Sequence, residues 1–404
     1  ILIISGLFVF GLPRIFQSSA QKVKPLTVEE KVLPKIADKN KNKIFDNLEE
    51  LLAGQSDTAL NDVILLLDEK LSAVLLANIK GLVGDFSIKF QYPSVSGIAA
   101  TLTKGQIIAL SKLPFIKQIE EDAKVVPFLD KATYWFGVQK ARTDFGLDGN
   151  MDGATTTYSK NDIVIAIIDT GIDPNHVDLD GGKIIGWKDF ATGAASPYDE
   201  VQGCGGHGTH VSSIAAGEGQ GNALYKGVAP GAALVGVKVL KRQGLDCVGK
   251  VSNVNAGVQW VIDNKTTYGI KIFNMSLGIA GSSDGLDSTS LLVNKAVDAG
   301  IIGVVAAGNE GPAKYTIGSP AAATGTITVG AMADVEPGAA TAGLPAKGFY
   351  QAYFSSRGPT ADNRIKPDIS APGVKITAAQ AGTTNGYIEY SGTSMSSPFI
   401  AGLA

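Results

Sequence analysis

The stretch NDIVIAIIDTGID, residues 161–173, decides the fold. Its centre is an unbroken apolar run at 163–168, which ends in Asp169, Thr170 and Gly171. A continuous apolar run, rather than an alternating one, is typical of a strand that is covered on both faces. The pattern therefore predicts a buried strand of a parallel sheet, with an acidic side chain leaving its carboxyl end.

Similar patterns follow along the chain. Further apolar runs lie at 233–240, 270–275, 301–307 and 326–329, and helical patterns lie between them at 207–217, 250–263 and 288–299. Strands that alternate with helices predict an α/β fold with a doubly wound, mostly parallel sheet. Ligands of such sheets bind beyond the carboxyl ends of the strands, so candidate functional residues are sought there.

A smaller pattern precedes this one at 62–120. Strands are expected at 62–68, 86–91, 96–101 and 115–119, and helices at 72–80 and 104–112. The order β-α-β-β-α-β predicts a small α+β domain of the ferredoxin-like, split βαβ kind. A domain of about 60 residues is marginally stable by itself.

The composition excludes several classes of protein. The chain has 404 residues, 35 Lys and Arg against 38 Asp and Glu, and 45% hydrophobic residues. A net charge of −3 argues against nucleic acid as a partner, because phosphate binding needs a concentrated basic surface. The apolar content provides a sizeable core and excludes disorder. Two cysteines exclude a disulfide framework but allow one bridge or half of a metal site.

The first residues favour export. Residues 1–12, ILIISGLFVFGL, form an apolar run that is too short to span a bilayer and is followed by Ser-Ser-Ala at 18–20. We expect the sequence to begin inside a secretory signal that is cut near Ala20, with no stable membrane anchor and a secreted product. A buried strand or an anchor remains the alternative. Residues 21–61 read as a polar lead-in.

Four side chains with catalytic potential lie at the ends of predicted strands or at the starts of predicted helices. Asp169 ends a strand, His207 begins a helix in GCGGHGTHV, Asn309 follows the run 301–307, and Ser394 begins a helix in SGTSMSSP. An acid, a base, an amide donor and a nucleophile are the components of acyl transfer. His210 is expected to be structural, and His176 to be exposed.

These segments resemble one family. DTGID, GHGTHV, AAGNEG and GTSMSSP, in the order Asp, His, Asn, Ser, are similar to the subtilisin-like serine proteases over about residues 130–404. The resemblance implies that Ser394 is the nucleophile, His207 the general base, Asp169 its orienting acid and Asn309 the oxyanion donor. It also implies a monomeric endopeptidase that cleaves protein and peptide substrates and needs no cofactor for catalysis.

The resemblance extends to a substrate cleft. One wall would be a strand that pairs with extended substrate, and the other a slot of small residues with an acidic rim. The substrate-binding residues that it implies are Ser276, Leu277, Gly278, Ala306, Ala307, Gly308, Glu310 and Gly318.

The resemblance also divides the chain. Residues 62–126 would be an inhibitory, folding-assisting propeptide, and 127–404 the catalytic domain. Residues 119–122 and the residues after them would lie in the cleft as an extended strand, with cleavage between about 123 and 131. The chain ends ten residues after Ser394, so we expect the catalytic domain to be truncated and to be less active and less stable than a longer form.

Calcium is expected as a structural cofactor. The loop 38–49 places oxygen-bearing side chains at positions 1, 3, 5, 9 and 12 of a calcium loop, although Lys43 replaces the usual glycine at position 6. A solvated helix start is the alternative for this loop. The other candidate ligands are Asp148, Asn150 and Asp152, with Asp178 as a match to a family calcium ligand.

The two cysteines have two interpretations. Cys204 lies three residues before His207, and Cys247 lies in a loop expected near the same rim, which favours a disulfide. The same cysteines with His207 and His210 could instead hold zinc, so a metal-binding protein is the alternative function. A non-catalytic binding relative is the other alternative.

Overall fold

The computed structural model describes residues 35–127, 138, 146, 148–154, 157–334 and 349–404. The expected signal at 1–20 lies outside the described residues, as do residues 128–131 of the expected cleavage region. None of the helices in the described part of the chain is long and apolar enough to span a membrane.

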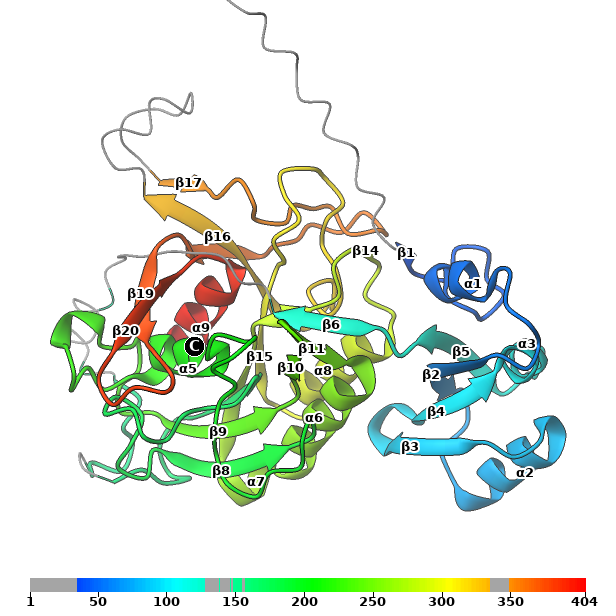
Figure 1. Cartoon of the computed structure of the whole chain (residues 1–404), viewed down its shortest axis with the longest axis horizontal. Helices are drawn as coiled ribbons and strands as arrows, with labels where there is room; N and C mark the ends of the chain where they lie inside the picture. Colours follow the sequence, from blue (N-terminus) through cyan, green and yellow to red (C-terminus); the bar gives the residue numbers. More distant parts are fainter. Residues whose placement is uncertain (1–34, 128–137, 139–145, 147, 155–156, 335–348) are drawn as a thin grey trace, which may run out of the picture. The chain divides into compact units, whose positions relative to one another are not determined.

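A mostly parallel sheet forms the centre of the larger domain (Figure 1). Its order is β17-β16-β15-β12-β7-β9-β8, with β18 also paired to β16, and only the β16–β17 pair is antiparallel. The strands are β7 (Val164–Asp169), β8 (Ile184–Asp189), β9 (Ala233–Lys238), β12 (Ile270–Met275), β15 (Ile302–Ala306), β16 (Ile327–Asp334), β17 (Phe349–Gln351) and β18 (Ile369–Pro372). The predicted doubly wound sheet is confirmed.

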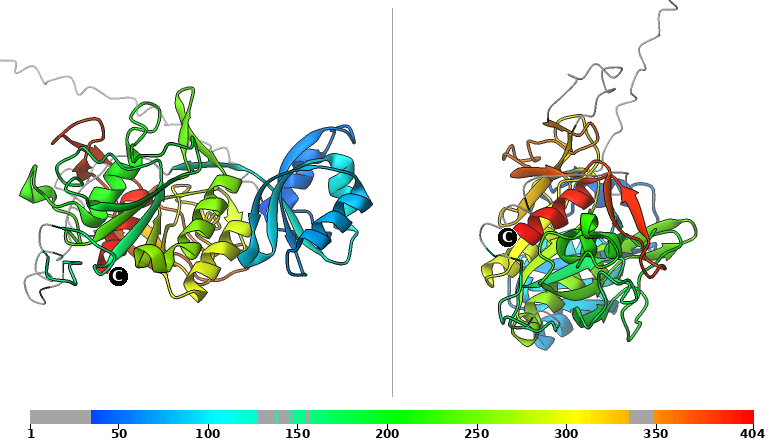
Figure 2. Two further views of the ribbon diagram at one scale, coloured as in Figure 1. Left: turned by 90° about the horizontal axis from the view of Figure 1, so that it is seen from below. Right: turned by 90° about the vertical axis from the view of Figure 1, so that its left-hand side faces the viewer.

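Helices cover both faces of this sheet, which explains the unbroken apolar run. Val164, Ala166 and Ile168 of β7 pack in one cluster with residues of α6 and α8, whereas Ile165 and Ile167 pack in a second cluster with residues of α5 and α9. The helices are α5 (His207–Ala216), α6 (Val251–Asp263), α8 (Ser288–Asp298) and α9 (Thr393–Leu403). Figure 2 shows them from two further directions. Both faces of β7 are therefore excluded from solvent.

A smaller antiparallel sheet, of order β3-β4-β2-β5, lies N-terminal to the large one. Its elements are β2 (Leu60–Leu67), α2 (Ala73–Val83), β3 (Ser87–Tyr92), β4 (Gly97–Thr103), α3 (Lys104–Ser111) and β5 (Ile116–Glu121). The sequence of elements and their order in the sheet are those of the expected split βαβ domain. Its core has its own apolar cluster, which includes Leu65, Ile79, Ile98 and Ile107.

The remaining elements are short. They are β1 (Lys35–Ile36), α1 (Asp46–Leu52), η1 (Pro93–Val95), β6 (Lys124–Pro127), η2 (Ala223–Tyr225), β10 (Lys241–Gln243), β11 (Asp246–Lys250), α7 (Lys265–Tyr268), β13 (Leu277–Gly278), β14 (Ser282–Ser283), β19 (Ile376–Ala379) and β20 (Tyr387–Tyr390). Four of them form a separate sheet of order β10-β11-β6-β13.

Candidate active site

The end of β7 and the start of α5 bring an acid and an imidazole together. Nδ1 of His207 lies 2.7 Å from Oδ1 of Asp169, and both side chains are buried. Oδ1 also accepts a hydrogen bond from Thr170 N at 2.7 Å. Among the described residues, Nε2 of His207 has no hydrogen-bond partner. The carboxylate therefore fixes the ring through Nδ1 and leaves Nε2 for another group.

Two glycines allow this approach. A Cβ atom at Gly208 would lie 2.1 Å from the carbonyl oxygen of Gly171, closer than any side chain tolerates. The first turn of α5 thus packs directly on the backbone that follows Asp169. Any larger residue at 208 would separate the acid from the base.

Ser394 is the second residue of α9, which packs against α5. Its Oγ donates to the carbonyl oxygen of Ser276 at 3.1 Å, and Ser276 Oγ donates to the carbonyl oxygen of Ser394 at 2.9 Å. These reciprocal bonds tie the start of α9 to the segment just before β13. The structure thus brings the predicted nucleophile to one predicted wall of the cleft.

Asn309 follows β15 in a turn that also contacts the start of α9. Its Oδ1 accepts from Thr393 N at 3.0 Å and from Thr393 Oγ1 at 3.1 Å. Gly308, at φ +104°, donates its N–H to the same hydroxyl at 3.2 Å. With Oδ1 occupied, the NH₂ group of the amide is directed away from Thr393, and no hydrogen bond between described residues uses it.

The predicted substrate-binding residues gather on neighbouring segments. Leu277 and Gly278 form β13, and Ile279 pairs with Ser319 in an antiparallel bridge. A Cβ atom at Gly318 would lie 2.0 Å from the carbonyl oxygen of Ile279, so this contact requires glycine. The other wall lies at the end of β15 and just beyond it, with Ala306, Ala307, Gly308 and Glu310. Both walls adjoin the Ser394 and Asn309 segments.

β6, a strand from the N-terminal part of the chain, lies beside β13. β6 pairs antiparallel with β13, Leu277 opposite Pro127 and Gly278 opposite Val126. Its other edge pairs antiparallel with β11, Gly249 opposite Val125. The two strands β11 and β13 therefore hold an extended segment between them.

The expectation that residues 119–122 lie in the cleft is wrong. Residues 119–121 belong to β5, where Ile119 pairs with Leu65 and is buried in the core of the small domain. The extended segment that pairs with β13, the strand predicted to line the cleft, is β6, which begins only at Lys124. Burial of the apolar Ile119 side chain in that core is more favourable in free energy than its exposure along an open groove.

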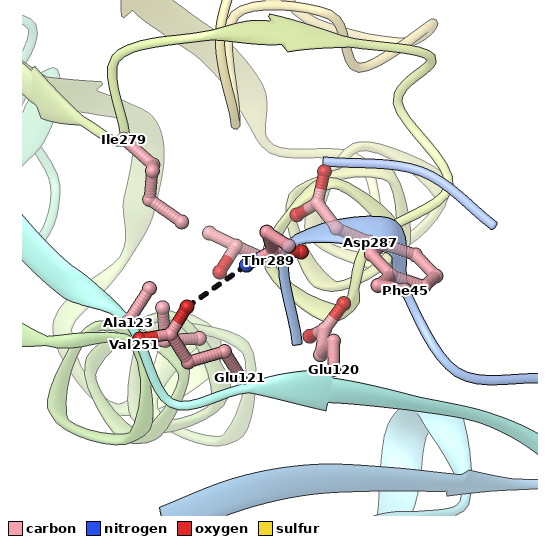
Figure 3. A pocket seen from close by; sticks show the side chains of 9 residues that line it. Phe45, Glu120, Glu121, Ala123, Val251, Ile279, Asp287 and Thr289 are labelled. Carbon is pink, nitrogen blue, oxygen red and sulfur yellow. Dashed lines mark hydrogen bonds between the residues drawn. The ribbon is translucent and has the colours of Figure 1, made fainter. Parts of the chain in front are cut away.

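Two acidic residues at the end of β5 contact the starts of two helices. Ser288 N of α8 donates to both oxygens of Glu120 at 2.8 and 2.9 Å, and Ser252 N of α6 donates to Asp122 Oδ1 at 2.6 Å. Figure 3 shows Glu120 near Asp287 in the small pocket beside α8. Burial, and then the charge of Asp287, raise the pKa of Glu120 well above its usual range. The two carboxylates therefore bind backbone N–H groups in the first turns of α8 and α6 that the N-cap side chains of these helices do not bind.

The cysteines form the expected disulfide. Cys204 and Cys247 are joined across a sequence separation of 43 residues, which links the loop before α5 to β11. The zinc hypothesis is wrong, because both thiols are used in the disulfide. Within the described residues, no group of three or more His, Cys, Asp or Glu side chains could hold a metal ion.

We expect the Cys204→Ala/Cys247→Ala double variant to be less stable by about 4 kcal/mol, because the link closes a long loop in the unfolded chain. Urea unfolding of the two proteins, both carrying Ser394→Ala to prevent autolysis, measures this difference. Equal midpoints, or two titratable thiols in the denatured, unreduced parent, would contradict the prediction.

The other two histidines are structural. Nε2 of His210 lies 3.1 Å from the carbonyl oxygens of both Ile376 and Ile388, so the ring joins α5 to β19 and β20. His176, expected to be exposed, is instead buried, with Nε2 at 2.8 Å from Gly386 O. Its sequence context of Pro and Asn pointed to a surface turn, but the turn is covered by the segment before β20.

Acid should destabilise the fold through His210. Burial, and then the neighbouring His207, lower the pKa of His210 to about 3 from 6.5. The unfolded chain therefore binds a proton that the folded chain does not, so this contribution to stability is complete above pH 6.5 and lost as pH falls toward 3. The slope is about 1.4 kcal/mol per pH unit. Unfolding free energies of wild type and His210→Gln measured from pH 7 to 4 should converge at low pH; parallel curves would refute this.

The candidate calcium ligands differ in what they contact. Asp178 accepts from Gly221 N at 3.1 Å and from Tyr387 Oη at 3.0 Å, so each of its oxygens binds a protein donor. Asp148 and Asp152 cap N–H groups of their own turn. In the loop 38–49, the side-chain amide of Asn40 donates to Glu49 at 2.8 Å, and that of Asn42 also donates to Glu49. Lys43 makes the turn at φ +74° without glycine.

Comparison with known proteins identifies the relatives of this chain. Residues 160–404 match the subtilase family, Peptidase S8. Serine protease AprX of Bacillus subtilis (strain 168) is 34% identical over 339 residues, which cover 78% of this chain and 71% of that protein. Subtilisin E of the same organism is 32% identical over 364 residues, covering 89% and 83%.

A solved structure shares the fold. Fervidolysin from Fervidobacterium pennivorans, a keratinolytic enzyme related to subtilisin, superposes with a TM-score of 0.63 over 92% of this chain at 20% identity. This chain spans 58% of the length of that protein. The four motifs, the doubly wound sheet and the matched relatives lead to one conclusion: the chain belongs to the subtilase family and is a subtilisin-like serine endopeptidase.

Proposed function

We propose that Asp169, His207 and Ser394 form the catalytic triad of this endopeptidase and that Asn309 completes its oxyanion hole. The observation that carries the proposal is the buried Asp169–His207 contact of 2.7 Å next to the start of the helix that holds Ser394. These groups come from three distant parts of the chain, and only the fold brings them together.

The roles follow from the geometry. His207 Nε2, without a partner among the described residues, accepts the proton of Ser394 as Oγ turns from Ser276 O toward the substrate carbonyl. The buried Asp169 carboxylate stabilises the imidazolium and holds its orientation. The imidazolium then returns the proton to the leaving amine, and the acyl-enzyme is hydrolysed by water in the reverse sequence.

The developing oxyanion has two donors. One is the NH₂ group of Asn309, directed away from Thr393, and the other is the backbone N–H of Ser394 at the N-terminus of α9. Donors fixed before the reaction stabilise charge that exists only in the transition state.

The test is covalent labelling together with turnover. The processed enzyme should hydrolyse a denatured protein and lose activity when a fluorophosphonate reacts with one serine. Mass analysis of the labelled peptide should locate the adduct at Ser394. Labelling of another serine, or turnover that the reagent does not affect, would reject the proposal.

We also propose that residues 62–126 are an inhibitory propeptide. The support is β6, which pairs with both β11 and β13 and so fills the strand position between them. Glu120 and Asp122 give further support, because their carboxylates cap α8 and α6. Cleft occupancy blocks substrate, while the caps stabilise two helices of the catalytic domain. The same segment therefore inhibits the enzyme and assists its folding.

The register predicts where this propeptide is cut. Pro127 pairs with Leu277, and Ser276, one residue earlier, is the residue whose carbonyl contacts Ser394 Oγ. Because β6 is held in this register beside the segment that contacts Ser394, we expect cleavage just beyond Pro127, within the range 123–131 that the sequence predicts. N-terminal sequencing of the mature enzyme should find a first residue between 128 and 132. A start inside 62–120 would contradict the propeptide itself.

Localisation, oligomeric state and calcium stay predictions. We propose a secreted monomer, in keeping with the signal-like residues 1–12 and a disulfide, which persists in oxidising compartments. Calcium binding to the loop 38–49 or the turn 148–152 stays a sequence prediction that would require the side chains to rearrange, because no group of three or more His, Cys, Asp or Glu side chains in the described residues could hold a metal ion. Calorimetry with calcium and with a chelator checks it, since equal unfolding temperatures would exclude a role of calcium in stability.

A further inference from the structure

We infer that Asp199 is a positioning residue that holds Asp169 and His207 in their reactive arrangement. This inference rests on the proposed triad. Asp199 is buried in the segment between β8 and α5, and its backbone forms an antiparallel bridge with Gly171. It contacts neither the imidazole nor the nucleophile in any hydrogen bond of the described residues. Its effect on the reaction must therefore pass through the groups that it binds.

One oxygen of Asp199 holds the chain that follows β7. Thr170 Oγ1 donates to Asp199 Oδ1 at 2.6 Å, and Thr170 N donates to Asp169 Oδ1 at 2.7 Å. The same Thr170 hydroxyl accepts the N–H of Gly208 at 2.8 Å. Thr170 thus connects the catalytic carboxylate to Asp199 and to the first turn of α5.

The other oxygen holds α5. Thr209, two residues after His207, donates to Asp199 Oδ2 through its backbone N at 2.8 Å and through Oγ1 at 2.6 Å. Its hydroxyl also accepts the N–H of Asp173 at 2.9 Å. One buried carboxylate therefore fixes both backbones that carry the Asp169–His207 pair. Because reacting groups lose about 10²-fold in rate when displaced by about 1 Å, this bridge should matter for turnover.

A buried lysine supplies the opposite charge. Lys238 Nζ on β9 donates to the carbonyl oxygen of Thr170 at 2.5 Å and to that of Leu240 at 2.8 Å, and it lies 3.4 Å from a Glu200 oxygen. The ammonium thus holds the backbone carbonyl of Thr170, whose side-chain hydroxyl binds Asp199. Burial raises the pKa of Asp199, while its hydrogen bonds with Thr170 and Thr209 oppose that shift.

Removal of the Asp199 charge should also change the pH dependence of turnover. The charged groups near the imidazole are Asp169 from β7 and, further out, Asp199 and the ion pair of Lys238 with Glu200. His210 on the same helix is neutral except in acid, because burial lowers its pKa to about 3. Loss of the Asp199 charge makes the imidazolium less favourable. The acidic limb of the pH profile of kcat/KM should then move to lower pH.

The experiment compares Asp199→Asn with Asp189→Asn in the processed enzyme. Asp189, at the end of β8, is also a buried carboxylate with several hydrogen bonds, but within the described part of the chain these bonds come from its own turn, from Ala191, Thr192 and Ala194. For Asp199→Asn we expect kcat to fall about 10²-fold, KM to stay within about twofold, and the acidic limb to shift. Asp189→Asn should keep kcat and the pH profile of the wild type.

A milder pair of variants covers the case in which Asp199→Asn does not fold. Thr209→Val removes one bond to Asp199 and should lower kcat about tenfold, and Thr209→Ser, which restores the hydroxyl, should recover it. The inference is overturned if Asp199→Asn matches Asp189→Asn in kcat and pH profile, or if Thr209→Val and Thr209→Ser are equal. A wild-type enzyme that is not labelled at Ser394 would instead overturn the proposed triad.

Discussion

Ser394→Ala is expected to lower kcat for peptide hydrolysis by about 10⁶-fold, the loss that subtilisin shows when its nucleophile is removed. Without Oγ no acyl-enzyme forms, and the fixed oxyanion donors alone give only a small residual rate. The same variant should accumulate as an uncut precursor. Steady-state kinetics with a fluorogenic peptide and electrophoresis of the purified chain measure both effects.

Ser396→Ala is the matched control. Its hydroxyl is on the same helix, is buried, and donates to Ala371 O at 3.0 Å, away from Ser276 and Asn309. It should process normally and keep kcat within about tenfold of the wild type. Comparable activity of Ser394→Ala and wild type would remove Ser394 from the mechanism.

Asp169→Asn should lower kcat by about 10⁴-fold at neutral pH. The carboxylate oxygen 2.7 Å from His207 Nδ1 accepts a hydrogen bond from the ring N–H, whereas an amide NH₂ in that place donates a hydrogen bond to the ring. The ring then carries its proton on Nε2 and is unable to accept the proton of Ser394. The pH dependence of kcat, together with fluorophosphonate labelling, shows whether the base has been lost while the nucleophile remains.

Asp173→Asn separates this effect from a general loss of charge in the same turn. Asp173 accepts from Asn175 N at 3.0 Å and Gly382 N at 2.7 Å and has no bond to His207 among the described contacts. It should lose stability but less than tenfold in kcat. If both variants lost kcat equally, orientation of His207 by Asp169 would not be the reason.

The sheet was predictable because most of its central strands are rich in apolar residues, without regular alternation of polar and apolar positions. The run 270–275 coincides with β12, and the run 163–168 differs from β7 by one residue at each end. β8 escaped prediction, since IIGWKD mixes polar and apolar residues along an outer strand. The β19–β20 hairpin escaped for a similar reason: its residues are mostly half-buried and show no clear period.

The predicted site residues were found because each stands at the end of a regular element. Asp199, Lys238 and Thr209 were missed because their importance comes from hydrogen bonds between segments far apart in sequence. Lys238 reads as the polar end of an apolar run, and a buried ammonium has no local signal. The signal that was available is the threonine that stands in both functional motifs, in Asp169-Thr170 and Gly208-Thr209.

The sheet β10-β11-β6-β13 has a consequence for what the enzyme can cleave. Release of β6 with the proposed propeptide would leave β11 and β13 facing each other as two unpaired edges about 10 Å apart, the space of one missing strand. Any chain that fills this space must be stretched out and must offer its own N–H and C=O groups on both sides. Main-chain pairing of that kind is indifferent to most side chains, so selection should depend chiefly on conformation: stably folded proteins should resist attack, and the same proteins should become substrates once a segment of about four residues unfolds.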